Sequence, residues 1–166
     1  MDVEVKQKTH LVFVYGTLKK SFPNSHLLKD AEYVGEYVTL DQYPLVVGGP
    51  WFSPYLLNVC GAGERVFGEV YKVSDHELED LDQLENVGVN YTRKLLKVEF
   101  VESPGRIMEV FAYLKCNYND DLLKKDYMAK YNDRRYIPRS KRAAYLAQET
   151  NLMTSSYKQS QTLESS

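Results

Sequence analysis

The 166-residue sequence predicts one small soluble domain of α+β class, in which short strands outnumber helices. Runs rich in β-branched and aromatic residues recur along the chain and are separated by Gly, Pro, Asn and Ser, a pattern typical of strands and turns. Only the segment after Val73 carries a strong helix signal. The length is sufficient for a single sizeable core.

The predicted strands follow one another with short connections. In chain order they are Leu11–Tyr15, Tyr33–Leu40, Tyr43–Gly49, Pro54–Val59, a run from Arg65 to Val73, and the runs 91–101 and 107–115. Ser103-Pro104-Gly105 joins the last two, which predicts a hairpin. A short helical or irregular stretch is expected over 24–30, after Pro23. A second helix is expected over 140–152, before a tail whose composition predicts disorder.

The strong helix begins with a capping box, Ser74-x-x-Glu77, and is predicted to run from Asp75 to Glu85. At about 100° per residue, its leucines at positions 78, 81 and 84 form one apolar stripe, and Glu85 falls within about 20° of Leu78. A carboxylate inside the buried face and near the helix C-terminus should have a raised pKa.

A raised pKa suits Glu85 to exchange protons near neutral pH as a general acid or base. The alternative is that the helix ends one residue early and Glu85 turns into solvent or meets an arginine such as Arg93. The helix geometry alone does not decide between them.

Composition argues against several other classes. No apolar run approaches the roughly 20 residues of a membrane span, and the N-terminal ten residues have no apolar core of a secretory signal, so a cytoplasmic protein is expected. Cys60 and Cys116 are expected to be free thiols, and they and three scattered histidines suggest no metal site. The net charge of −2 argues against nucleic acid as the main partner. We expect a monomer, since no exposed apolar stripe is evident.

One segment departs from this balance. Between Leu122 and Arg142 there are eight Lys or Arg residues against Asp126 and Asp133. Such a basic segment could meet phosphates, or it could be a solvated surface that balances an acidic body.

Several motifs resemble, in order, those of the gamma-glutamylamine cyclotransferases, within the wider gamma-glutamylcyclotransferase-like (AIG2-like) family. The likeness runs from about Leu11 to Arg139. The motifs are VFVYGTLKK (12–20), PN (23–24), YPLVVGG (43–49), PYLL (54–57), GEVYKV (68–73), LDQLE (81–85), YTR (91–93) and YIPR (136–139).

The resemblance implies a small β-barrel-like mixed sheet with short packed helices, and an intramolecular aminolysis that uses no metal or organic cofactor. The α-amine of a γ-glutamyl group attacks its own γ-carbonyl, which gives 5-oxoproline and releases the attached amine. For this type of enzyme the substrate would be ε-(γ-glutamyl)lysine from degraded transglutaminase crosslinks, and the released amine would be lysine. The residues that match the family's site are Glu85 as catalytic residue and Tyr15, Gly16, Thr17 and Leu18 as substrate-binding loop, with Tyr91 and Tyr136 as candidate pocket walls.

These residue types suit that chemistry. Glu85 could take the proton from the α-ammonium and return it to the leaving amine. Backbone N–H groups of the loop could stabilise the oxyanion, and Gly16, which lacks Cβ, would let the ligand come close to them. Gly16→Val should therefore cost more activity than Thr17→Ser.

The resemblance divides the chain into an extension (1–10), a cyclotransferase-like domain (11–139), and a C-terminal helix with tail (140–166). The chain departs from the family pattern at Pro50–Ser53 and between Asn117 and Arg135. Two alternatives to the gamma-glutamylamine activity remain open. One is action on γ-glutamyl amino acids, and the other is a non-catalytic binding module that uses the basic segment and tail.

Overall fold

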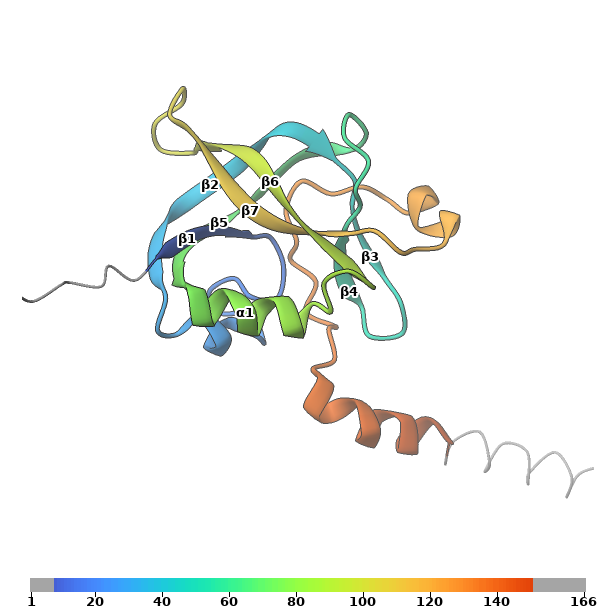
Figure 1. Ribbon diagram of the computed structural model, residues 1–166. Helices are drawn as coiled ribbons and strands as arrows, with labels where there is room; N and C mark the ends of the chain where they lie inside the picture. Colours follow the sequence, from blue (N-terminus) through green and yellow to red (C-terminus); the bar gives the residue numbers. More distant parts are fainter. Residues whose placement is uncertain (1–7, 151–166) are drawn as a thin grey trace, which may run out of the picture.

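The computed structural model describes residues 8–150 (Figure 1). Five strands form a closed barrel in the order β1 (Thr9–Val14), β5 (Glu64–Ser74), β2 (Glu32–Tyr43), β6 (Tyr91–Phe100) and β7 (Ile107–Lys115). Neighbouring strands are antiparallel except β1 and β7, whose parallel contact closes the barrel. The predicted small barrel-like mixed sheet is thereby confirmed.

The remaining elements lie around the barrel (Figure 1). A hairpin of β3 (Leu45–Gly48) and β4 (Ser53–Leu56) forms a second, two-stranded sheet. Two short 3₁₀ helices and one α-helix complete the labelled elements, namely η1 (Ser25–Leu28), η2 (Asp120–Lys124) and α1 (Asp75–Leu84). Residues 139–150 are also helical and project away from the barrel.

The barrel has an apolar interior because buried and more exposed residues alternate along its strands. Along β5, residues Val66, Gly68 and Val70 are buried while several of their neighbours are more exposed, as expected for a strand with one face on a core. Aromatic rings and aliphatic side chains from all five barrel strands and from the β3–β4 hairpin fill one cluster in the interior, including Phe13 and Tyr37.

Helix α1 packs on the outside of the barrel. The predicted capping box is confirmed: Ser74 Oγ accepts from the Glu77 N–H at 3.1 Å, and Glu77 Oε1 accepts from the Ser74 N–H at 3.0 Å. Leu78 and Leu81 are buried in a second cluster together with side chains of β1 and β5. Each buried leucine contributes about 1.5–3 kcal/mol, so the leucine stripe fixes the helix to the barrel.

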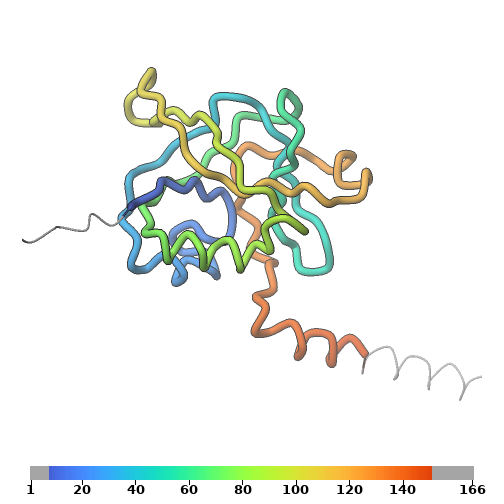
Figure 2. The backbone as a smooth tube through the Cα atoms, viewed as in Figure 1, coloured from blue at the N-terminus to red at the C-terminus, as the bar shows by residue number. Residues whose placement is uncertain are grey.

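The chain after η2 returns across the barrel (Figure 2, orange). We call residues 127–139 the return segment. Met128 N–H donates to Leu45 O at 3.0 Å, and Phe67 N–H donates to Ala129 O at 2.8 Å. The buried Lys19 Nζ donates to Tyr131 O at 2.7 Å. The return segment is therefore attached to the barrel, to the hairpin and to the loop after β1.

Several predicted boundaries are wrong by a few residues. The first strand begins at Thr9 and ends at Val14, and the strand predicted over 54–59 ends at Leu56. Helix η2 was not predicted, because its five residues are too few for a periodic pattern. The last two residues of the helix predicted over 140–152, the predicted disordered tail and most of the N-terminal extension lie outside the described residues.

Within residues 8–150, no helix is long and apolar enough to cross a membrane. Over the same range no three His, Cys, Asp or Glu side chains are grouped so that they could hold a metal ion. Cys60 and Cys116 are exposed free thiols.

Candidate functional site

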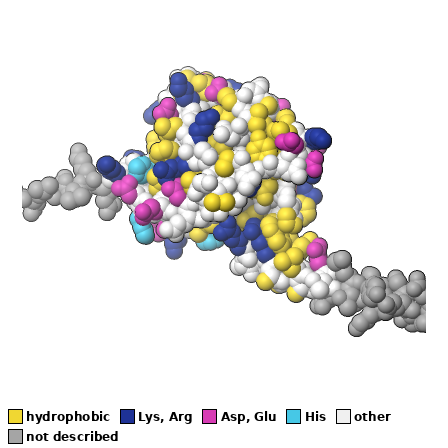
Figure 3. All heavy atoms as spheres, turned by 45° about the vertical axis from the view of Figure 1, so that its right-hand side comes forward, with side chains coloured by type: hydrophobic (Ala, Val, Ile, Leu, Met, Phe, Trp, Pro, Cys, Tyr) yellow, Lys and Arg dark blue, Asp and Glu magenta, His cyan; other side chains and the backbone are white. Residues whose placement is uncertain are grey.

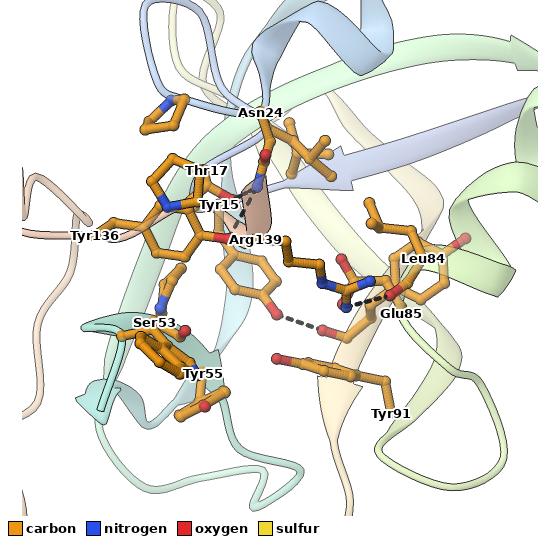
Figure 4. Close-up of a pocket in the computed structure, with 18 of the residues that line it drawn as sticks. Tyr15, Thr17, Asn24, Ser53, Tyr55, Leu84, Glu85, Tyr91, Tyr136 and Arg139 are labelled. Carbon is orange, nitrogen blue, oxygen red and sulfur yellow. Dashed lines mark hydrogen bonds between the residues drawn. The ribbon is translucent and has the colours of Figure 1, made fainter. Parts of the chain in front are cut away.

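A pocket of about 840 Å³ opens where the loop after β1, the end of α1, the β3–β4 hairpin and the return segment meet. All the site residues proposed from the sequence line it, namely Tyr15, Gly16, Thr17, Leu18, Glu85, Tyr91 and Tyr136. Figure 4 shows Glu85, Arg139 and Tyr91 on one side and Asn24, Thr17 and Tyr136 on the other. The fold thus gathers residues from four distant parts of the sequence into one cavity.

The end of α1 positions Glu85. The last helical residue is Leu84, and Glu85 is the C-cap, so the helix ends one residue earlier than predicted. Asn86 follows in the left-handed region at φ 49°. The N–H of Val87 donates to Asp82 O and that of Asn86 donates to Gln83 O, the two hydrogen bonds of a Schellman motif.

The early helix end does not send Glu85 into solvent. Its side chain is only partly exposed and lines the pocket. Arg93, the partner considered from the sequence, instead forms an ion pair with Asp82. Asp82 also accepts a hydrogen bond from Tyr113 Oη at 2.7 Å. The alternative was therefore right about the helix end, but the Glu85 carboxylate lies in the pocket near Arg139 and not in solvent or beside Arg93.

Burial dominates the electrostatics of Glu85 and raises its pKa from 4.5 to about 7, although the nearby Arg139 and Lys115 act in the opposite direction. Arg139 is held beside Glu85 because its Nη2 donates to Leu84 O at 3.0 Å. Lys115 Nζ lies 5.1 Å from the ring centre of Tyr91 and 5.2 Å from that of Tyr55. A carboxyl group with this pKa can both accept and donate a proton at neutral pH.

The loop after β1 lines the pocket and includes backbone N–H groups that have no protein acceptor in the described part of the chain. The carbonyls of Gly16 and Thr17 accept from the N–H groups of Lys19 and Asn24. Within the described residues, the N–H groups of Gly16, Thr17 and Leu18 donate to no other protein group. Since unpaired backbone donors in a pocket wall are suited to an anionic oxygen, this loop could bind a carboxylate or a developing oxyanion.

Gly16 has a packing role that sequence reasoning missed. A Cβ at this position would lie 2.5 Å from Pro54 Cγ, so any side chain would push the loop away from β4. The expectation that glycine allows a ligand to approach is untested, but the contact with Pro54 alone requires a residue without Cβ.

Tyrosines form much of the remaining wall. Tyr15 Oη donates to Tyr113 O at 2.5 Å, and burial raises the pKa of Tyr15. Burial also raises the pKa of Tyr91, whose phenol lies near Tyr15 and Glu85. Tyr136 Oη accepts from Asn24 Nδ2 at 3.2 Å, and the same amide nitrogen donates to Thr17 Oγ1 at 2.9 Å. The phenols of Tyr15 and Tyr91 are thus neutral hydrogen-bonding groups at physiological pH.

Several lining residues were missed as site residues, chiefly Asn24, Trp51, Tyr55, Lys115, Arg139 and Arg142. Three of them stand in motifs that were quoted from the sequence, Asn24 in PN, Tyr55 in PYLL and Arg139 in YIPR. Lys115 ends β7, and no local pattern connects it with a site. Trp51 lies in the β3–β4 turn, where the chain departs from the family pattern.

The basic segment is not one free patch. Lys130 pairs with Glu36 at 3.9 Å, Arg135 pairs with Asp133 at 2.6 Å, and the Arg134 guanidinium lies 3.9 Å from the ring centre of Phe22. Its last members, Arg139, Lys141 and Arg142, line the pocket instead. These contacts leave fewer charges for a polyanionic partner than the sequence suggested.

Known proteins that resemble this chain in sequence carry the name of cyclotransferases. The model of the family "Gamma-glutamyl cyclotransferase, AIG2-like" matches residues 12–133. Gamma-glutamylaminecyclotransferase B of Danio rerio is 42% identical over 129 residues, which cover 74% of this chain and 68% of the relative. The Homo sapiens gamma-glutamylaminecyclotransferase is 34% identical over 151 residues, which cover 80% and 99% of the two chains.

A solved structure agrees in fold. The crystal structure of an AIG2-like protein from Mus musculus is 34% identical and superposes with a TM-score of 0.75, covering 79% of this chain and 97% of that one. The barrel, the pocket and these matches lead to one conclusion: the chain belongs to the gamma-glutamyl cyclotransferase, AIG2-like family, a family of cyclotransferase enzymes.

Proposed function

We propose that this enzyme is a gamma-glutamylamine cyclotransferase that converts a γ-glutamyl amine, such as ε-(γ-glutamyl)lysine, into 5-oxoproline and the free amine. The observation that carries the proposal is Glu85, a partly buried carboxyl group with a pKa of about 7, in the same pocket as the unpaired N–H groups of Gly16, Thr17 and Leu18. The gamma-glutamylaminecyclotransferases among the relatives support the choice of substrate class.

In this proposal Glu85 moves the proton. The ionised carboxylate removes a proton from the α-ammonium group of the substrate, and the free amine nitrogen attacks the γ-carbonyl carbon. As the bond between that carbon and the leaving nitrogen breaks, the protonated Glu85 returns the proton to the leaving amine. The regenerated Glu85 carboxylate then takes the excess proton from the ring nitrogen, and this second proton ends on the released amine, which departs as an ammonium ion. One group can serve both steps because its pKa lies close to the working pH.

The backbone donors stabilise the charge that develops. As the five-membered ring closes, the γ-carbonyl oxygen becomes an oxyanion, and N–H groups already fixed in the Gly16–Leu18 loop can bind it without reorganisation. The Asn24 amide, which donates to both Thr17 and Tyr136, ties the loop to the return segment.

Binding must also fold the substrate. The glutamyl chain is flexible, and ring closure requires its amine and γ-carbonyl to come into contact, so a narrow cavity that selects this conformer accelerates the reaction. Tyr15 and Tyr91, which lie close to Glu85, are proposed to provide that constraint.

The test is direct. The purified protein is incubated with ε-(γ-glutamyl)lysine, and 5-oxoproline and lysine are quantified by chromatography, beside a panel of γ-glutamyl amino acids. Glu85→Gln should abolish turnover, whereas Glu79→Gln, an exposed carboxylate on the same helix, should not. Full activity in Glu85→Gln would exclude the mechanism, and preference for γ-glutamyl amino acids would exclude the substrate class. A cytoplasmic location, a monomeric state and the absence of a cofactor stay predictions.

A further inference from the structure

The mouth of the pocket is built from residues outside the matched family region and from the β3–β4 turn. Trp51 lies in that turn, and Lys141 and Arg142 lie at the start of the C-terminal helix. Figure 3 shows Lys and Arg side chains beside hydrophobic ones where this helix leaves the barrel. We call Trp51, Lys141 and Arg142 the mouth residues.

Trp51 is held firmly. Its carbonyl accepts from the Ile137 N–H at 3.1 Å, and the next carbonyl, of Phe52, accepts from Tyr131 Oη at 3.1 Å. Phe52 has a φ of 56°, which is costly for a bulky residue and persists only where its surroundings fix it. The Trp51 ring also packs edge-on against Tyr145, with 5.9 Å between ring centres. The indole is therefore a fixed apolar wall.

Arg142 is fixed beside it. Its guanidinium lies 5.1 Å from the Trp51 ring centre, Nε donates to Ile137 O at 3.0 Å, and Nη2 donates to Tyr136 Oη at 3.3 Å. Tyr136 in turn accepts from Asn24, which donates to Thr17, so hydrogen bonds connect the mouth with the substrate loop. The remaining N–H groups of Arg142 stay available for a ligand, since a guanidinium has more donors than these two bonds use.

The charges of the pocket do not balance. Its wall has four cationic side chains, Lys115, Arg139, Lys141 and Arg142, and Glu85 is the one acidic residue among the described residues that line it. Within residues 8–150, no carboxylate lies within ion-pair distance of any of these four cations. The pocket is therefore suited to a ligand that carries more than one negative group.

The positions of these cations separate Lys115 and Arg139 from Arg142. Lys115 and Arg139 lie close enough to Glu85 to act on its charge, which places them beside the reacting glutamyl group and its single α-carboxylate. Arg142 is bonded to Tyr136 and stacked near Trp51, on the other side of the cavity. Because Glu85 must return a proton to the leaving nitrogen, the rest of the leaving amine extends away from the γ-carbonyl and toward the mouth.

We propose, on the basis of the proposed function, that Trp51, Lys141 and Arg142 form a subsite for the leaving amine that selects amines with a carboxylate at the end of an apolar chain. The carboxylate binds the free N–H groups of Arg142 and the ammonium of Lys141, and the apolar chain lies against the Trp51 indole. Simple alkyl amines and amines whose carboxylate is blocked cannot form the contact with Arg142 and Lys141, so they should bind less well as leaving groups.

A matched pair of substrates tests this subsite. ε-(γ-Glutamyl)lysine and its α-carboxamide have the same length and the same reacting bond and differ in the leaving group's carboxylate. The wild type should prefer the acid in kcat/KM by about tenfold, the size expected of one charge-assisted hydrogen bond. The preference should appear mainly in KM, because the carboxylate is bound equally before and during reaction.

Variants of Arg142 and Lys141 show which side chains cause the preference for the acid. Arg142→Gln and Lys141→Gln should each reduce the ratio of acid to amide, and the double variant should bring it near one. Arg142→Lys, which keeps the charge and loses the fork of donors, should have an intermediate ratio. Lys125→Gln, an equal loss of charge at an exposed site outside the pocket, should keep the wild-type ratio. Lys141 is exposed, so its variant tests the subsite even where Arg142→Gln folds poorly.

The outcomes separate the two proposals. Equal kcat/KM for the acid and the amide in the wild type would overturn the subsite and leave the cyclotransferase function standing. A preference that persists in the double variant would overturn the assignment of these residues. Formation of 5-oxoproline from neither substrate would overturn the proposed function and the subsite with it.

Discussion

Replacing Glu85 with Gln should raise the stability of the protein at alkaline pH while it abolishes activity. Burial in the pocket raises the pKa of Glu85 from 4.5 to about 7. The folded protein therefore binds this proton more tightly than the unfolded chain, and folding is penalised wherever the carboxyl group must ionise. Glutamine has nearly the same shape and no charge to bury.

The magnitude follows from the two pKa values. Each pKa unit is worth about 1.36 kcal/mol, so a rise from 4.5 to about 7 corresponds to at most about 3 kcal/mol of unfolding free energy. For a raised pKa, the stabilising effect of protonation is complete below about pH 4.5 and is lost as the pH rises through 7. Glu85→Gln should thus match the wild type near pH 4.5 and exceed it by up to about 3 kcal/mol at pH 8.

Urea unfolding followed by circular dichroism at pH 4.5, 6 and 8 gives the assay, with Glu79→Gln as the exposed control on α1. For a domain of this size, about 3 kcal/mol should raise Tm by about 6–12 °C. A variant that is equally or less stable than the wild type at pH 8 would refute the claim that Glu85 is ionised at a cost. The same samples, assayed for 5-oxoproline, connect that cost with catalysis.

Three further predictions concern residues that hold the site in place, at the end of α1 and in the loop after β1. Asn86→Val should destabilise the protein by about 1–2 kcal/mol and reduce turnover, because a β-branched residue is disfavoured at φ 49°, whereas Asn86→Gly should keep both. Gly16→Val should lower Tm and activity together through overpacking of about 1–3 kcal/mol against Pro54, whereas Thr17→Ser should change Tm little. Burial lowers the pKa of Lys19 to about 8, so the unfolding free energy of the wild type relative to Lys19→Met should increase as the pH rises from 7 to 10.

Each of these has a contradicting result. Equal stability of Asn86→Val and Asn86→Gly would show that the Schellman turn does not constrain Glu85. A Gly16→Val protein with normal Tm and no activity would favour ligand approach over packing as the reason for the glycine. A pH-independent difference between wild type and Lys19→Met would show that the lysine is not penalised by burial.

The local features of this protein could be read from its sequence because short-range interactions determine them. The capping box of α1, its leucine stripe and the hairpin of β6 and β7 depend on residues that are neighbours in the chain, and the structure has all of them. The Schellman end of α1 could have been predicted too, since Asn, after Gly, is the residue that most readily takes the left-handed position behind a helix.

The site could be predicted only in part. Glu85 emerged from helix geometry, and the loop 15–18 from a motif, but neither pattern indicated that they share a cavity. Closure of the barrel by β1 and β7 and the return of residues 127–139 across it bring them together. Such contacts join distant segments, as for Lys19 and Tyr131, which are 112 residues apart, and no local pattern encodes them.

The mouth of the pocket shows most clearly which features follow from the sequence and which from the tertiary structure. The sequence by itself determined that a basic segment exists between Leu122 and Arg142, and that the turn around Trp51 differs from the family pattern. Only the tertiary structure decided that part of the segment neutralises nearby acids while Arg142 packs beside Trp51 at the pocket. The physical reason is that a charge has a role only through what lies within a few ångströms of it, and the folded chain alone sets those distances.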